Sequence, residues 1–187
     1  MKRHIVRSLQ TLMAVISLSI TTTLPAEVAA RPETLHGGME YERLLAEMRE
    51  VMAAAGYPAL ITVDEGGQPR ARTVDAFEPD AAMTVWIATR PNTRKVAQIR
   101  NHPAVTLYYF DASSRSYVTL MGQAELVDDV ETKMAMRRDR DGARLYPDFP
   151  DDYLLIKITA EYLEALVPSY RGDPETWAPI RVDLLER

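Results

Sequence analysis

Apolar residues between positions 39 and 55 recur at steps of three and four, the spacing that gathers side chains on one face of an α-helix. Polar and charged residues fill the positions between them, and Gly56 and Pro58 follow the last apolar position. Glycine and proline commonly end helices. The pattern predicts an amphipathic helix over residues 39–55, with a buried face formed by Tyr41, Leu44, Leu45, Met48, Val51, Met52 and Ala55.

Short apolar stretches between turn residues predict β-strands along the rest of the chain. A polar turn at 64–67 joins strands at 59–64 and 68–76 into a hairpin. Further strands are expected at 83–88, 104–110, 117–127 and 153–159, and residues 162–167 offer a continuation of the last strand. Gly122 interrupts the strand at 117–127, which indicates a bulge or a tight barrel bend.

After the helix at 39–55, helices are expected only at connections between strands. One covers residues 94–101, with Asn92 and Thr93 available as its cap, and a polar one covers 128–140. Residues 31–38 resemble a flexible lead-in, and the tail from about 168 is expected to be irregular, with Trp177 as its aromatic anchor. These elements predict a mainly β fold with α decoration, a small barrel of six mostly antiparallel strands.

Residues 1–30 have the order of a secretory signal peptide. The basic residues Lys2, Arg3 and Arg7 precede an apolar run at 12–20, and small residues follow at 28–30. The run is nine residues long, well short of the roughly 20 that a membrane-spanning helix needs. We therefore expect an exported protein, periplasmic or secreted, with a domain of residues 31–187. The alternative is that residues 1–30 form an amphipathic helix of the domain.

Composition narrows the classes of function. A content of 47% hydrophobic and 26% charged residues is typical of a globular protein. The net charge of -5 disfavours binding to nucleic acid, and the absence of cysteine excludes disulfides and thiol catalysis. His36 and His102 lack the spacing of metal ligands, so no metal site is expected. Arginines alternate with aspartates in residues 137–144, and we expect them to form a solvated or dimer-facing surface. These arginines are Arg137, Arg138, Arg140 and Arg144.

The segment 88–95 (ATRPNTRK) is the most informative one for function. It places Arg94 and Lys95 in the first turn of a predicted helix. The positive end of the helix dipole makes a cation unfavourable there by about 0.3–1 kcal/mol, unless an anion is bound. Free backbone N–H groups and the hydroxyls of Thr89 and Thr93 complete a set of donors suited to phosphate. The alternative is a solvated basic helix end.

A second basic feature lies in the predicted strand at 68–76. Alternate residues of a strand share a face, so Arg70, Arg72 and Val74 point one way and Ala71, Thr73 and Asp75 the other. An arginine directed into a barrel groove can bind phosphate through paired hydrogen bonds. The alternative is an arginine on the solvent face of the hairpin.

In their order and spacing, these segments resemble the pyridoxamine 5'-phosphate oxidase-like FMN-binding split barrels, within them most closely the general stress protein branch. The resemblance covers about residues 40–165 and includes the sequence GQAELV at 122–127. It implies a split barrel and a homodimer that holds FMN in a groove between two barrels. It assigns the FMN phosphate to Arg72, Thr89, Arg94 and Lys95, beside Ala88, and the isoalloxazine ring to the backbone of Thr73, Val74 and Asp75.

Three positions depart from the pattern of this family. Phe77 stands where some members have lysine, Tyr117 where some have glutamine, and Leu166 where many have tryptophan. Trp177 and Arg181 of the tail are candidates to replace the missing tryptophan. Because these changes alter the ring and substrate contacts, oxidation of pyridoxamine 5'-phosphate itself is not expected.

The residues leave two main classes of function open. One is an FMN-dependent oxidoreductase acting on a small molecule, in which the flavin supplies the chemistry and no catalytic side chain stands out. The other is a non-catalytic cofactor-binding or stress-response protein that holds flavin, haem or a deazaflavin, with His102 as the candidate haem ligand. A dimeric scaffold with an empty groove is a third alternative.

Overall fold

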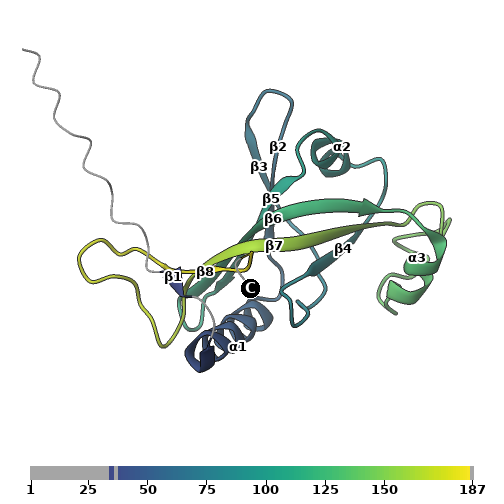
Figure 1. The fold of residues 1–187 in the computed structure, drawn as a ribbon. Coiled ribbons are helices and arrows are strands. Elements are labelled where there is room, and N and C mark those ends of the chain that lie inside the picture. Colours follow the sequence, from purple (N-terminus) through teal and green to yellow (C-terminus); the bar gives the residue numbers. More distant parts are fainter. Residues whose placement is uncertain (1–33, 36–37, 186–187) are drawn as a thin grey trace, which may run out of the picture.

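A computed structural model describes residues 34–35 and 38–185 of the 187-residue chain, so the predicted signal peptide lies outside the described residues. The described part contains one eight-stranded sheet in the order β1-β8-β7-β6-β5-β2-β3, and β4 pairs with β7 off this path (Figure 1). The helices are α1 (Gly38–Ala55), α2 (Arg94–Asn101) and α3 (Val130–Met136); the strands are β1 (Thr34–Leu35), β2 (Ala59–Val63), β3 (Pro69–Thr73), β4 (Val85–Thr89), β5 (Ala104–Asp111), β6 (Ser116–Val127), β7 (Leu154–Leu166) and β8 (Ile180–Asp183).

The two long strands β6 and β7 form the centre of the sheet and pair antiparallel along most of their length. The other edge of β7 is shared, because β4 pairs with its first half and β8 with its second half. The register of β6 and β7 shifts between Met121 and Gly122, which confirms the predicted irregularity. A Cβ atom at Gly122 would lie 2.0 Å from the carbonyl oxygen of Thr159, so only glycine fits at this crossing.

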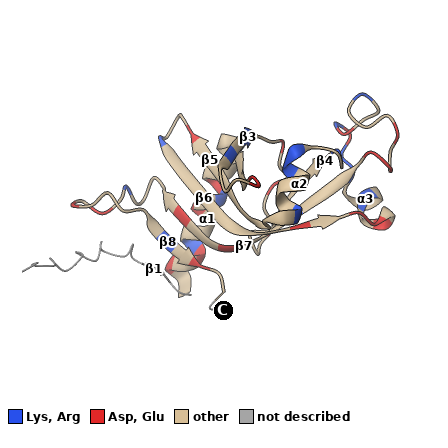
Figure 2. Cartoon of the chain, turned by 90° about the horizontal axis from the view of Figure 1, so that it is seen from above, with Lys and Arg blue, Asp and Glu red and all other residues tan. Residues whose placement is uncertain are grey.

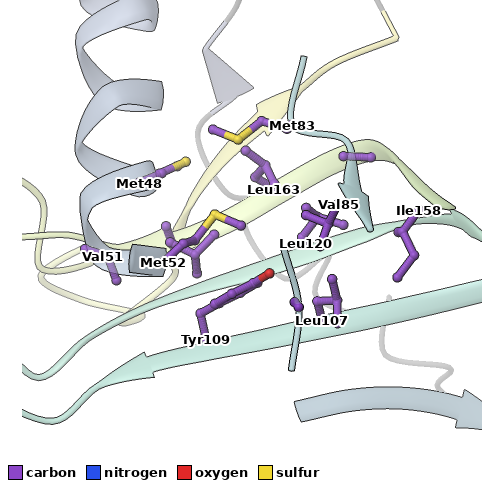
Figure 3. Packing of buried hydrophobic residues seen from close by; sticks show 14 of the residues in the cluster. Met48, Val51, Met52, Met83, Val85, Leu107, Tyr109, Leu120, Ile158 and Leu163 are labelled. Carbon is purple, nitrogen blue, oxygen red and sulfur yellow. The ribbon is translucent and has the colours of Figure 1, made fainter. Parts of the chain in front are cut away.

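Helix α1 covers one face of the sheet, packed against β5 and β6 (Figure 1). The face predicted from the sequence is the buried one, and Met48 and Met52 are at most 1% exposed. Figure 3 shows these methionines above core residues of the sheet that include Leu107 and Leu120. Full burial of such a side chain contributes about 1.5–3 kcal/mol. None of the three helices among the described residues is long and apolar enough to span a membrane.

The six strands predicted from the sequence correspond to β2–β7. Strands β3 and β4 do not pair with each other, and a single bridge between Ala76 and Ile87 joins the chain after β3 to β4, so the sheet is not closed. Helix α3 ends at Met136 rather than at 140, and the carboxylate of Asp129 caps it by accepting from the Thr132 N–H at 2.8 Å. Residues 162–167 do continue the preceding strand, as one uninterrupted β7 reaching Leu166.

The predictions for the two ends of the domain were partly wrong. The tail contains β8, which pairs antiparallel with β7, and β1 from the supposed lead-in pairs parallel with β8. Trp177 is not an anchor, because 76% of it is exposed. Ile180 and Val182, which alternate along β8 and are buried in the core, hold the tail in place instead.

Candidate functional site

Six of the eight residues assigned to the cofactor line one hollow of about 290 Å³. It lies where the end of β3, the end of β4 and the start of α2 meet. Ile87 adds to its apolar floor, and Leu145 and Tyr146 form the opposite wall. The six residues are Thr73, Val74, Asp75, Ala88, Thr89 and Lys95.

Arg72 is half-buried between β2 and α2 and bonds only to neutral groups. One terminal nitrogen, Nη1, donates to Thr62 Oγ1 at 2.6 Å and to the Leu60 carbonyl at 3.2 Å. The other, Nη2, donates to Gln98 Oε1 at 2.9 Å, and that oxygen also accepts from Thr62 Oγ1. The sequence interpretation missed Thr62 and Gln98. The spacing of Gln98, one helical turn after Arg94, was the available signal.

Three cations lie within electrostatic reach of one another beside the hollow. Burial and the charge of Arg94 lower the pKa of the Arg72 guanidinium, and burial and the charge of Arg72 lower the pKa of the Lys95 ammonium. Within the described residues, Arg94 and Lys95 make no ion pair. A bound anion would relieve this mutual repulsion. Figure 2 shows basic positions on both α2 and β3.

The side chain of Arg94 is directed differently from that of Lys95. Arg94 lines a neighbouring hollow together with Asp64 and Glu65, whereas Lys95 lines the main one. Asp64 pairs with Arg70 at 2.7 Å, and neither carboxylate forms an ion pair with Arg94 in the described part of the chain. The structure therefore assigns Arg70 to the hairpin turn and leaves Arg72, Arg94 and Lys95 as the basic cluster of the site.

The start of α2 has no side-chain cap. Thr93 occupies the cap position, but its hydroxyl donates to the Arg90 carbonyl at 3.1 Å instead of accepting from the helix. The first turn also lacks an acidic residue. Thr89, 4% exposed, places its Oγ1 atom 3.5 Å from that of Thr93. Uncapped N–H groups at the positive end of a helix favour an anion.

The chain that follows α3 forms one wall of the hollow. Arg90 donates to the Leu145 carbonyl from Nε at 2.9 Å and from Nη2 at 2.6 Å, which fixes this wall to the end of β4. On the far side, Arg138 and Arg140 bind the carboxylate of Asp75 at 3.3 and 3.1 Å. None of these wall contacts was predicted, because they join segments more than 50 residues apart.

Arg138 corrects the prediction of a solvated or dimer-facing basic surface. Its Nε atom donates to Asp141 at 2.8 Å, and Asp141 is 1% exposed and also accepts from the Tyr153 hydroxyl at 3.1 Å. Burial raises the pKa of Asp141, but the hydrogen bonds and charge of Arg138 outweigh it and hold the pKa below its ordinary value. The guanidinium also stacks on Phe77, so a cation stands beside the position where some family members have lysine.

The remaining candidates lie outside this hollow. Tyr117 pairs with the ring of Tyr108 at a centroid distance of 5.6 Å, and Arg181 stacks on Tyr162. His102 is the exposed residue that ends α2, opposite the basic first turn. In the part of the chain that the structure describes, no group of three or more histidines and carboxylates is placed to hold a metal ion.

The sequence model of the family described as pyridoxamine 5'-phosphate oxidase matches residues 44–166. The chain belongs to this family. No curated protein matches it. A Clostridium acetobutylicum protein related to general stress protein 26 is similar in structure, with a TM-score of 0.65 and 22% identity over 78% of this chain and 97% of that one.

Two further solved structures have the same fold. General stress protein 26 of Bacillus anthracis has a TM-score of 0.56 and 22% identity over 66% of this chain and 94% of its own. A pyridoxamine 5'-phosphate oxidase-related, FMN binding protein of Nostoc punctiforme has a TM-score of 0.56 and 16% identity, over 74% of this chain and 89% of its own. The family therefore confirms the split-barrel fold expected from the sequence.

Proposed function

We propose that this protein binds FMN in the hollow of about 290 Å³ and acts as a flavin-dependent oxidoreductase on a small molecule. The observation that carries the proposal is the basic cluster of Arg72, Arg94 and Lys95, which forms no ion pair with an acidic residue in the described part of the chain and lies beside an uncapped helix start. A phosphate supplies the missing negative charge. Membership of the family, and the FMN binding protein of Nostoc punctiforme, support this choice of ligand.

The rest of the hollow suits a flat ring system. Val74, Ile87 and Ala88 give it an apolar floor. Strand β3 is at the edge of the sheet and pairs only with β2, so one side of its backbone is available where it reaches Thr73. Asp75 is held by two guanidinium groups and stays at the wall. These features support the assignment of the isoalloxazine ring to the backbone of residues 73–75.

Bound flavin supplies hydride and electron transfer, which no side chain of the hollow can provide. The residues of this chain bind the phosphate, orient the ring and exclude water with the wall at Leu145 and Tyr146. We assign no catalytic side chain. Oxidation of pyridoxamine 5'-phosphate is not proposed, because a second phosphate would need cations of its own, and Arg138 and Arg140 are already paired with Asp75.

We further propose a homodimer formed through the exposed aromatic face of the sheet. Tyr108 and Phe110 of β5 are 37% and 50% exposed, and Tyr117 on β6 lies directly opposite Phe110. Large exposed apolar patches mark interaction sites. A second copy of this chain is the proposed occupant, since the family resemblance places the flavin between two barrels.

Export of the protein through a signal peptide at residues 1–30 remains part of the proposal. Its support is the charge, length and small-residue order of that segment. N-terminal sequencing of protein recovered from the periplasm or culture medium tests it. A chain that begins near residue 31 agrees with cleavage, and an intact N-terminus on soluble exported protein contradicts it.

The first experiment is the visible spectrum of the purified protein before and after titration with FMN. Saturable quenching of flavin fluorescence, with flavin bands that remain after gel filtration, is the expected result. Absence of FMN uptake contradicts the proposal. Reduction of the bound flavin by a nicotinamide donor, followed by reoxidation with turnover, distinguishes an enzyme from a non-catalytic binder.

A further inference from the structure

The guanidinium of Arg72 is held by three acceptors, and none of them carries a charge. Thr62 Oγ1 and the Leu60 carbonyl accept from Nη1, and Gln98 Oε1 accepts from Nη2. Other arginines of the described chain, such as Arg70, form ion pairs with aspartates instead. A half-buried guanidinium without a carboxylate partner keeps its whole positive charge for a ligand.

The positions of these acceptors determine which N–H groups of Arg72 stay available. Thr62 Oγ1 and Gln98 Oε1 lie 2.6 Å apart, so together they occupy the terminal edge of the guanidinium, one opposite each terminal nitrogen. The Leu60 carbonyl accepts the second N–H of Nη1. Among the described residues, Nε–H and the second N–H of Nη2 have no partner. These two groups point in parallel from one side of the guanidinium, the arrangement that binds two oxygens of a phosphate.

Gln98 is the residue that keeps this arrangement neutral. Its oxygen accepts from Arg72 and from the hydroxyl of the fully buried Thr62, so two donors fix the orientation of the amide. A glutamate has the same length and would offer a carboxylate oxygen to both donors. That carboxylate would form an ion pair with Arg72 and compensate the charge on which phosphate binding depends.

We propose that Gln98 is a positioning and specificity-determining residue. Its neutral oxygen, together with Thr62, orients the Arg72 guanidinium for a phosphate and leaves the arginine charge uncompensated. Gln98 thereby sets the preference of the site for a phosphorylated flavin over one without phosphate. This inference rests on the proposed function, which assigns Arg72 to the FMN phosphate, and adds the residues that act through Arg72.

Gln98→Glu tests the inference, with Asn101→Asp as its matched control. Asn101 is exposed about one turn later on α2, and its substitution also changes an amide to a carboxylate. FMN and riboflavin, which lacks the phosphate, are titrated into each protein and followed by flavin fluorescence. Gln98→Glu is expected to weaken FMN at least about tenfold, as for the loss of one hydrogen bond to a charged group, without weakening riboflavin. Asn101→Asp is expected to leave both affinities within about twofold.

A double-mutant cycle measures whether Gln98 acts through Arg72. In Arg72→Gln, which lacks the guanidinium, the further change Gln98→Glu is expected to alter FMN affinity by only about twofold. In the natural background, Gln98→Glu is expected to be at least as stable in urea without FMN, because its carboxylate gains a cationic partner.

Thr62→Val removes the other side-chain anchor of Arg72 and serves as a second variant should Gln98→Glu fail to fold. It is expected to weaken FMN while leaving riboflavin affinity within about twofold, even where the lost hydroxyl lowers stability. A purely structural role of Thr62 would weaken both flavins in parallel.

Failure of this inference is distinguishable from failure of the proposed function. If the natural protein binds FMN, an unchanged ratio of FMN to riboflavin affinity in Gln98→Glu overturns the role of Gln98 and leaves the FMN site standing. An equally large loss of FMN affinity in the Arg72→Gln background has the same meaning. If the natural protein binds no FMN, the proposed function and this inference fail together.

Discussion

The guanidinium carbon of Arg138 lies 4.0 Å from the centroid of the Phe77 ring. This contact joins the chain after α3 to the chain after β3, 61 residues earlier in the sequence. Asp75 and Asp141 accept hydrogen bonds from the same guanidinium. One arginine therefore ties the chain after α3 to the wall of the candidate cofactor hollow at Asp75.

The double substitution Arg94→Ala with Lys95→Ala is expected to weaken FMN binding at least 100-fold. Each hydrogen bond from a charged group to phosphate contributes about 1.5–3 kcal/mol, and about 1.4 kcal/mol corresponds to tenfold in affinity. Fluorescence titration measures the loss. Arg100→Ala, at the other end of α2, removes a basic residue of the same helix and serves as the control. Unchanged affinity in the double variant contradicts the assignment of the phosphate.

Lys95→Gln is expected to stabilise the protein without FMN while weakening its binding of FMN. The lysine pKa is lowered by burial and by Arg72, so the charged form destabilises the fold. Removal of a cation from the first turn gains about 0.3–1 kcal/mol. Urea unfolding with and without FMN measures both effects, and a destabilised variant without FMN contradicts the repulsion.

The pH dependence of FMN binding follows from the same group. Protonated Lys95 binds the phosphate, so its contribution is complete below its pKa in the free protein. It is lost as the pH rises from that value, which lies below the ordinary 10.5, to the higher pKa of the same group beside the phosphate. Affinity measured between pH 7 and 10 is expected to fall more steeply in the natural protein than in Lys95→Gln.

Asp141→Ala is expected to destabilise the protein by about 1.5–3 kcal/mol at pH 7, since it removes the closest charged partner of the half-buried Arg138 and leaves Asp75 as its remaining one. The folded-state pKa of Asp141 is depressed below 3.8. Its stabilisation is therefore present above that ordinary value and lost as the pH falls through the folded-state pKa. Urea unfolding at pH 7 and pH 3 is expected to show a smaller difference at pH 3. Asp139→Ala, an exposed neighbour, is the control.

Gly122→Ala is expected to destabilise the protein by about 3 kcal/mol, because the new methyl group meets the backbone of β7 and cannot be accommodated by a side-chain movement. Gly142→Ala is a matched control, since the nearest atom to a Cβ there is 3.7 Å away. Thermal unfolding of the two variants gives the comparison. Similar melting temperatures contradict the close approach of β6 and β7.

Phe110→Ser is expected to convert the proposed dimer into a monomer without unfolding the domain. The side chain is 50% exposed and lies outside the core of each chain. Light scattering after gel filtration measures the mass. Trp177→Ser changes a more exposed aromatic residue on the tail and is expected to leave the dimer intact. A natural protein that is already monomeric contradicts the dimer.

Local patterns in the sequence predicted the secondary structure of the barrel well. Helix α1 follows from the spacing of apolar residues only three or four positions apart. The irregularity at Gly122 follows from one close contact between β6 and β7. The short strands β1 and β8 were missed, because their stability comes from pairing with each other and with β7 rather than from their own composition. Trp177 was misjudged because size and apolar character do not determine which residue of a tail is buried.

The proximity of the candidate site residues was predictable in part for the same reason. Thr89 and Lys95 follow β4 within a few residues, so local order placed them together. Gln98 as a partner of Arg72, and Arg138 as a partner of Asp75, depend on the packing of separate elements. Within the described residues, the three-dimensional path of the chain, not residue type, determines which basic residues form ion pairs with carboxylates and which do not.

The pairing of β1 with β8 ties the first described strand of the domain to its last. A chain made from its N-terminus cannot complete this edge of the sheet until Ile180–Asp183 has been synthesised. Truncation before Ile180 therefore removes the partner of β1 as well as β8 itself.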